Sequence, residues 1–124
     1  MSNEAVVRDF VDTMNDLDWE GVYAALTPDV VVHNMPMPPL HGVEAVRGFF
    51  DAVPPITSCD WEILRMTSDG AWVFNERLDN FVMAGQSVSL PVMGLFEIAG
   101  GKIKTWRDYF DLKDFERQLG QPLG

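Results

Sequence analysis

The chain has 124 residues, of which 47% are hydrophobic and 23% are charged, and these values exclude a disordered chain and leave too few residues for two domains. The net charge of −10 disfavours nucleic acid as a partner, because phosphates would repel an acidic surface. The sequence has no apolar run of membrane-spanning length and no signal-peptide pattern at its start, so we expect residues 1–124 to form a single soluble cytoplasmic domain.

The first part of the chain is predicted to be helical. An amphipathic helix is expected over residues 4–16, where the apolar side chains recur at helical spacing: Val7, Phe10, Val11 and Met14. Asp18 is a suitable N-cap for a second helix that runs through Leu26, and Thr27-Pro28-Asp29 is its predicted stop. A short β-branched strand over residues 29–34 is expected to follow.

The segment NMPMPPLHG, residues 34–42, separates this strand from a third helix. Its three prolines oppose regular strand pairing, so we expect irregular structure here. The third helix is predicted over residues 43–52, with its large apolar side chains on one side: Val46, Phe49 and Phe50.

The rest of the chain is predicted to be β-structure that is closed by a helix. Four segments are rich in aromatic and β-branched residues: 58–67, 71–84, 87–98 and 102–110. Three short turns separate them: Ser68-Asp69-Gly70, Ala84-Gly85-Gln86 and Ala99-Gly100-Gly101. A final helix, residues 111–119, begins at its N-cap Asp111. This order predicts an α+β fold in which a curved, mostly antiparallel sheet forms a cone, with helices packed around one internal pocket.

Charged side chains lie in the middle of two of these strands. Because successive strand residues alternate between faces, NERLDNF places four side chains on one face: Asn75, Arg77, Asp79 and Phe81. The same alternation groups three side chains of KIKTWRDYFD: Trp106, Asp108 and Phe110. An unpaired buried aspartate is costly, so Arg77 is the expected partner of Asp108, with Asp79 on the other side of Arg77. We therefore expect an Asp–Arg–Asp row across neighbouring strands.

An arginine between two carboxylates has a chemical use. It can hold one carboxylate ionised while the other stays protonated, because their surroundings push the two pKa values apart. A base that activates water and an acid that protonates a leaving oxygen then coexist at neutral pH. The structural alternative is a buried ion-pair network that only fixes strand register. The residues alone leave both interpretations open.

The remaining candidates are polar groups near the prolines and apolar groups on the strands. Asn34 ends its strand where the prolines begin, which suits either the rim of a pocket or a simple turn. His33 and His41 have no third ligand at a suitable spacing, so no metal site is predicted. Cys59 is interpreted as a small buried hydrophobe rather than a nucleophile. The apolar candidates for the pocket lining, or for ordinary core, are Met35, Met37, Phe81, Met83, Leu90, Val92 and Phe110.

Four stretches, HNMPMPPLHG, NERLD, GLFEIAGGKIKTWRDYFDLKDFE and QPLG, resemble the limonene-1,2-epoxide hydrolase family in content and order. The resemblance covers nearly all of the chain. It implies an NTF2-like or SnoaL-like cone fold, a homodimer, and one-step hydration of a small apolar epoxide without metal or cofactor. It further implies that Asp108 activates water, that Asp79 protonates the epoxide oxygen and that Arg77 bridges them. Asn34 would help to hold the water.

One position departs from the family pattern. Two residues before the asparagine of the NMP motif the family carries a tyrosine whose hydroxyl also holds the water, and here that residue is Val32. Val32 and Asn34 share a strand face, so we expect the valine to line the pocket beside the water. Tyr23 on the second helix is the candidate for a replacement hydroxyl.

Three functions from different classes are consistent with these residues. The leading interpretation is an epoxide hydrolase. The second is an isomerase or an epoxide-opening cyclase that uses the same acids, with an internal hydroxyl in place of water. The third is a non-catalytic module that binds a small ligand, because the cone fold hosts all three functions.

Overall fold

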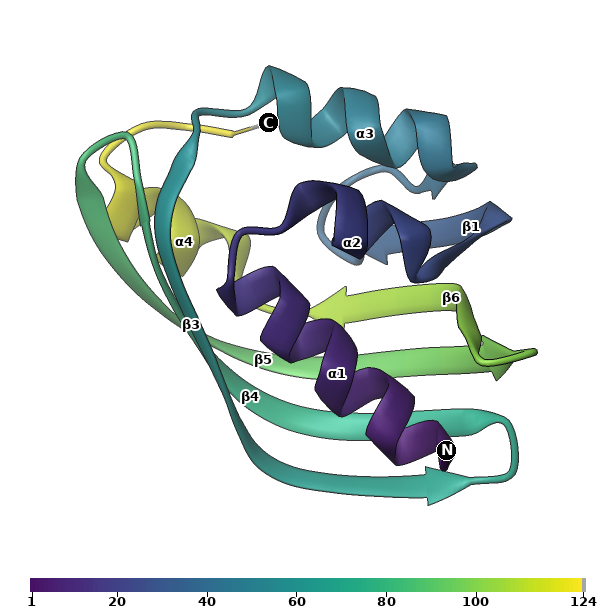
Figure 1. The fold of residues 1–124 in the computed structure, drawn as a ribbon. Helices are drawn as coiled ribbons and strands as arrows, with labels where there is room; N and C mark the ends of the chain where they lie inside the picture. The colour runs from purple at the N-terminus through teal and green to yellow at the C-terminus, as the bar shows by residue number, and fades with distance from the viewer. Residues whose placement is uncertain (124) are drawn as a thin grey trace.

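The computed structural model describes residues 1–123, which form four helices and one six-stranded sheet (Figure 1). In chain order the elements are α1 (Asn3–Asn15), α2 (Trp19–Ala24), β1 (Leu26–Asn34), β2 (Leu40–His41), α3 (Val43–Ala52), β3 (Ile56–Asp69), β4 (Trp72–Met83), β5 (Gln86–Ala99), β6 (Lys102–Tyr109) and α4 (Leu112–Leu119).

The strands are arranged in the order β2-β1-β6-β5-β4-β3. All neighbours are antiparallel except β1 and β6, which pair in parallel across the long connection through the meander. The sheet curves around α1, while α3 lies beside β1 and α4 packs against β5 at the other end (Figure 1). The predicted fold class, α+β with a curved sheet covered by helices, is confirmed.

Two apolar clusters hold the helices to the sheet. The larger one forms where the buried stripe of α1 meets the strands, and the Phe10 ring lies edge-on to Trp106, with ring centroids 5.1 Å apart. The smaller cluster lies beneath α4, where Phe115 packs edge-on to Phe81 at 5.5 Å. Burial of apolar surface of this kind is the dominant stabilising term in folding.

The predicted helix starts are confirmed, but the second helix is shorter than expected. The side chains of Asp18 and Asp111 accept hydrogen bonds from backbone N–H groups in the first turns of α2 and α4, as N-caps do. The prediction that the second helix reaches Leu26 is wrong, because Leu26 begins β1 and is buried against the core. Pro28, expected in the helix stop, lies within β1 where the pairing with β6 shifts register, and such irregularities tolerate proline.

The proline-rich segment contains more pairing than expected. Pairing resumes directly after Pro39, where β2 joins β1 through two residues: Leu40 opposite Val32 and His41 opposite Val31. The three later turns are close to their predicted places, and Ala84 and Gly85 both have positive φ, at 52° and 74°. This geometry matches a two-residue hairpin turn whose twist agrees with the flanking strands.

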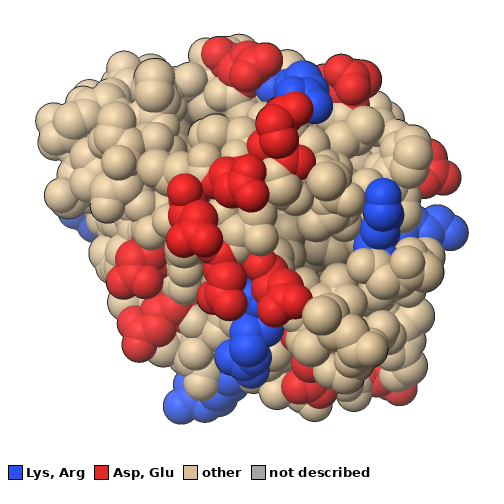
Figure 2. Space-filling model, viewed as in Figure 1, with Lys and Arg blue, Asp and Glu red and all other residues tan. Residues whose placement is uncertain are grey.

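Most of the charged side chains over the helices are acidic. Figure 2 shows that carboxylate side chains outnumber basic ones on this face, and the exposed residues of α1 and the turn after it include Asp9, Asp12 and Asp16. In the part of the chain described, no helix is long and apolar enough to cross a membrane.

Candidate active site

The predicted row on β4 faces the interior of the cone. Asn75 and Arg77 are each 1% exposed, and Asp79 is 4% exposed. These three side chains alternate with outward-facing residues along the strand, so the period of two alone places them together. A buried charge must be paired, and the contacts of Arg77 meet this requirement.

Arg77 is the centre of the cluster. Its Nε donates to Asp79 Oδ1 at 2.9 Å and its Nη2 donates to Asp79 Oδ2 at 3.0 Å, which is a bidentate pair. The same Nη2 donates to Asp108 Oδ2 at 2.8 Å, so one nitrogen bridges both carboxylates. The guanidinium carbon also lies 4.6 Å from the centre of the Trp61 ring, at cation–π distance.

The second carboxylate comes from β6, two strands away from β4. Asp108 is 5% exposed and lies opposite Gly94 on β5, which in turn lies opposite Asn75 on β4. The parallel pairing of β1 with β6 places Asn34 beside Asp108 and Val32 beside Trp106. The register of four adjacent strands therefore assembles the cluster.

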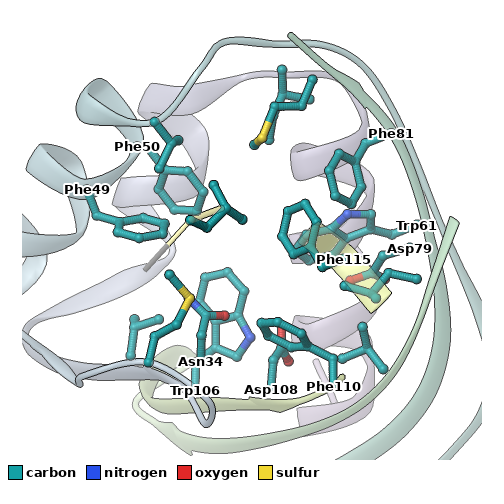
Figure 3. A pocket seen from close by; sticks show the side chains of 18 of the residues that line it. Asn34, Phe49, Phe50, Trp61, Asp79, Phe81, Trp106, Asp108, Phe110 and Phe115 are labelled. Atoms are coloured by element: carbon teal, nitrogen blue, oxygen red, sulfur yellow. The ribbon is translucent and has the colours of Figure 1, made fainter. Parts of the chain in front are cut away.

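An apolar cavity opens above this cluster. Its wall contains Asn34, Asp79 and Asp108 as its polar members, and Figure 3 shows their side chains among the aromatic rings that surround the central space. Arg77 does not line the cavity, so the guanidinium supports the carboxylates without presenting itself to a ligand. The remaining lining residues are Val32, Met37, Leu40, Phe49, Phe50, Val53, Ile56, Trp61, Phe81, Met83, Leu90, Val92, Trp106, Phe110, Phe115 and Leu123.

Seven of the eight apolar residues predicted as candidates for the pocket lie in this wall: Val32, Met37, Phe81, Met83, Leu90, Val92 and Phe110. Met35 does not, and this prediction is corrected. Its backbone N–H continues the pairing to Asp108 O at 2.9 Å, so strand alternation sends its side chain to the face opposite Asn34. Met37, the candidate two residues further on, does line the cavity.

The acid pair, Asp79 and Asp108, shares one positive charge in an apolar setting. With both acids ionised the cluster carries a net charge of −1, whereas one added proton makes it neutral. Burial raises the pKa of Asp79 from 3.8 to about 6, although the charge and hydrogen bonds of Arg77 act in the opposite direction. Burial also opposes the charge on Arg77, but Asp108 and Asp79 together outweigh it and raise the pKa of Arg77.

Two other candidate groups, Cys59 and His33, make no hydrogen bond to the Arg77 cluster. Burial raises the pKa of Cys59 to about 12, so the thiolate that a nucleophile needs is disfavoured. His33 Nε2 lies 2.9 Å from the Met37 carbonyl oxygen. Within residues 1–123, no three His, Cys, Asp or Glu side chains form a group that could hold a metal ion.

Tyr23 does not reach the acid pair. It lines a second cavity, together with Trp19 and Arg47, and the Arg47 guanidinium carbon lies 4.4 Å above its ring. Its hydroxyl therefore does not supply the polar contact that Val32 lacks. Val32 is 3% exposed and lines the same cavity as Asn34 and the acid pair. The cavity wall is therefore apolar at this position.

Sequence reasoning missed residues that complete the site. Strand alternation predicts the face of Asn75 but not its contact, which is a hydrogen bond that Asn75 accepts from Arg77 Nη1 at 3.0 Å. Gly94 does carry a signal in the sequence, because a lone glycine inside a strand is a known sign of close backbone approach. Trp61, Phe115 and the tail residue Leu123 also line the cavity, and these depend on tertiary packing that no local pattern reveals.

The fold and the site together define a small cone-shaped α+β protein whose internal apolar cavity carries an arginine-bridged pair of buried aspartates. Over residues 1–120 the chain matches the sequence profile of the limonene-1,2-epoxide hydrolase catalytic domain. It is 31% identical over 113 residues to epoxide hydrolase EphG of Mycobacterium tuberculosis (strain ATCC 25618 / H37Rv), an alignment that covers 91% of this chain and 76% of the relative.

Solved structures agree with this match. An M. tuberculosis LEH-like epoxide hydrolase superposes with a TM-score of 0.79 at 30% identity, covering 94% of this chain and 88% of that chain. A SnoaL-like protein from Shewanella putrefaciens CN-32 gives a TM-score of 0.84 at 15% identity, with 97% and 98% of the two chains covered, and it shows the shared fold alone. The chain belongs to the limonene-1,2-epoxide hydrolase family.

Proposed function

We propose that this protein is an epoxide hydrolase that adds water to a small apolar epoxide in one step. The observation that carries the proposal is the Arg77 guanidinium, which bridges two buried carboxylates that both line an apolar cavity. Membership of the family and the name of the relative EphG support the same reaction class. The apolar wall supports an apolar substrate.

In the proposed step Asp108 is the general base and Asp79 is the general acid. Asp108 takes a proton from water as the water oxygen attacks one carbon of the ring. The bond from that carbon to the ring oxygen breaks, and Asp79 gives its proton to the oxygen, which yields a vicinal diol. Water supplies one oxygen and two hydrogens overall. The step leaves Asp108 protonated and Asp79 ionised, and proton exchange with solvent then removes the proton from Asp108 and restores one to Asp79. The step calls on no cofactor.

The surroundings of each acid suit its assigned role. A general acid works best with a pKa near the working pH, and burial raises that of Asp79 to about 6. Asp108 Oδ2 is held by Arg77, while its buried Oδ1 has no hydrogen-bond partner among residues 1–123. A buried acceptor without a donor is costly, so this oxygen favours a proton-bearing partner such as the attacking water. Asn34 lies beside Asp108 in the register and supplies a second polar contact for that water.

A single-turnover experiment in ¹⁸O-enriched water tests the proposal. Excess enzyme is mixed with cyclohexene oxide or limonene-1,2-epoxide, and the product is analysed by mass spectrometry. One-step hydrolysis places one ¹⁸O atom in the diol in the first turnover. Attack by a carboxylate would instead deliver an unlabelled enzyme oxygen first. The Asp108→Asn variant serves as the matched control and is expected to form diol ~10²–10⁴-fold more slowly.

Val32 supports the second candidate, an isomerase or epoxide-opening cyclase. The apolar side chain removes a polar contact from the place where water would be held, which suits a reaction that uses an internal hydroxyl. An unlabelled rearranged product in the same experiment would support this candidate. Unchanged epoxide that nevertheless binds would leave only the small-ligand binding module.

The expected homodimer is also part of the proposal. Strand alternation places several exposed apolar side chains on the face of the sheet that points away from the helices: Leu64, Phe74, Met93 and Tyr109. A second copy of the chain would remove this surface from water.

A further inference from the structure

Arg77 has a third polar contact besides the acid pair. Asn75 Oδ1 accepts from Arg77 Nη1 at 3.0 Å, and Asn75 is as deeply buried as Arg77 itself. This contact lies on the opposite side of the guanidinium from the edge that binds Asp79. The guanidinium is therefore held at two of its edges, by the charged Asp79 and by the neutral Asn75.

Holding this plane matters because a single nitrogen serves both acids. Arg77 Nη2 reaches Asp79 at 3.0 Å and Asp108 at 2.8 Å, and each bond uses one of its two hydrogens. A tilt of the guanidinium about its bonds to Asp79 would lengthen the contact to Asp108. Asn75 opposes that tilt, and the Trp61 ring limits motion on one face.

Gly94 provides the space in which the guanidinium lies. Gly94 is opposite both Asn75 and Asp108 in the sheet, so the side chain of Arg77 passes over it to reach β6. A Cβ at this position would lie 2.3 Å from Arg77 Nη1 and 2.5 Å from Asn75 Oδ1, which is far inside van der Waals contact. Glycine is required here because any side chain would collide with Arg77 and Asn75.

The neutrality of Asn75 fixes the charge of the cluster. Aspartate has almost the same shape as asparagine, and it would add a third negative charge around one arginine. The charged or titratable groups that act on Asp79 are Arg77 on the same strand and Asp108 on β6. On β3 the Cys59 thiol interacts with Asp79, and it is neutral because burial raises its pKa to about 12. The neighbours on β5 and α4 are apolar.

We propose that Asn75 and Gly94 are positioning residues that act through Arg77, and that together they set the acid pair to share one proton. Neither residue lines the cavity, so neither touches the substrate. The kinetic consequences rest on the proposed function, whereas the proton count of the cluster can be measured without any substrate.

Three variants test the inference. Asn75→Leu keeps the approximate size and removes the acceptor, Asn75→Asp keeps the acceptor and adds a charge, and Gly94→Ala fills the space. The matched controls are Asn80→Leu and Asn80→Asp on the same strand, because Asn80 bonds Asp60 O and Ser89 Oγ away from the cavity. Circular dichroism and thermal melting establish which variants fold, and the two Asn75 variants suffice if Gly94→Ala does not.

The first readout is titration of the aspartate side-chain carboxyl carbons by ¹³C NMR. In Asn75→Asp the acid pair should hold its proton to a pH at least about one unit higher, since a third acid now shares Arg77. The Asn80 controls should leave this titration unchanged. Unchanged titration of Asp79 and Asp108 in Asn75→Asp would overturn the inference.

The second readout separates kcat from KM. Asn75→Leu and Gly94→Ala should lower kcat by about 10²-fold, the size seen when one preorganised contact is lost, and should change KM by less than about threefold. Asn75→Asp should recover kcat at its own optimum while its alkaline limb moves to higher pH. Equal kcat in Asn75→Leu and the parent would overturn the positioning role. If the parent itself turns over no epoxide, the proposed function fails, and the NMR titration still decides this inference.

Discussion

The buried acid pair should make this protein lose stability as the pH rises from about 4 to about 7. Asp79 is 4% exposed, and its burial raises its pKa from 3.8 to about 6 in the folded protein. The unfolded chain has no such burial, so its Asp79 keeps the ordinary value. The folded state therefore binds a proton more tightly than the unfolded state does.

The size of the effect follows from this difference of about two pKa units, which corresponds to about 3 kcal/mol of unfolding free energy. The sign is set by the direction of the shift. The stabilisation is fully present below pH 3.8 and is lost as the pH rises through about 6. About 2 kcal/mol of it should be lost above pH 4.5, where most exposed carboxylates are already ionised.

Urea unfolding between pH 4.5 and pH 8 measures this loss. The unfolding free energy of the parent should fall relative to that of Asp79→Asn by about 2 kcal/mol over this range, because other titrating groups cancel in the difference. Asp9→Asn on the exposed side of α1 is the control and should track the parent. A difference that stays flat, or that grows with pH, would show that Asp79 is ionised throughout and cannot act as the acid.

Four further predictions concern single positions. Asp108→Asn should lower diol formation by ~10²–10⁴-fold while circular dichroism shows an intact fold, since a positioned base is lost. Arg77→Ala should cost about 3–5 kcal/mol in urea unfolding at pH 8 and less at pH 4.5, because two buried acids lose their counter-charge. Val32→Tyr should raise diol formation by up to ~10²-fold at a stability cost of ~1–3 kcal/mol, and a well-folded variant that is no faster would mean that the water site is already complete. Met93→Glu, at a position 51% exposed, should turn a dimer into a monomer in sedimentation velocity, whereas a parent that sediments as a monomer would contradict the expected dimer.

The parts of this protein that strand alternation governs could be predicted from the sequence. Arg77 and Asp79 share a face because two residues separate them, and a charged pair on a buried face must find a partner. The structure supplies Asp108 as that partner at 2.8 Å. N-caps were equally predictable, because Asp18 and Asp111 bond backbone groups only three residues away.

The parts that depend on distant packing could not be predicted. Whether Pro28 ends a helix or lies in a strand is decided by the register shift between β1 and β6, two strands that are far apart in the sequence. Met35 and Met37 look alike in the sequence, and only the continued pairing of Met35 with Asp108 sends the two side chains to different places. Gly94 matters only because a side chain from another strand lies across it.

A single extra residue in β6 brings Asp108 to the cavity. Ile103 is fully buried, and strict alternation from it would point Trp106 and Asp108 away from the core. The pairing with β5 moves one step, from Ile98 to Glu97, while β6 advances from Ile103 to Thr105. Such a bulge shifts the alternation by one, so the apolar anchor before it and the acid after it both face inward. The place of Asp108 in the cavity wall therefore depends on an irregularity that costs one ladder position, and the buried residues on both sides of the bulge hold the register in place.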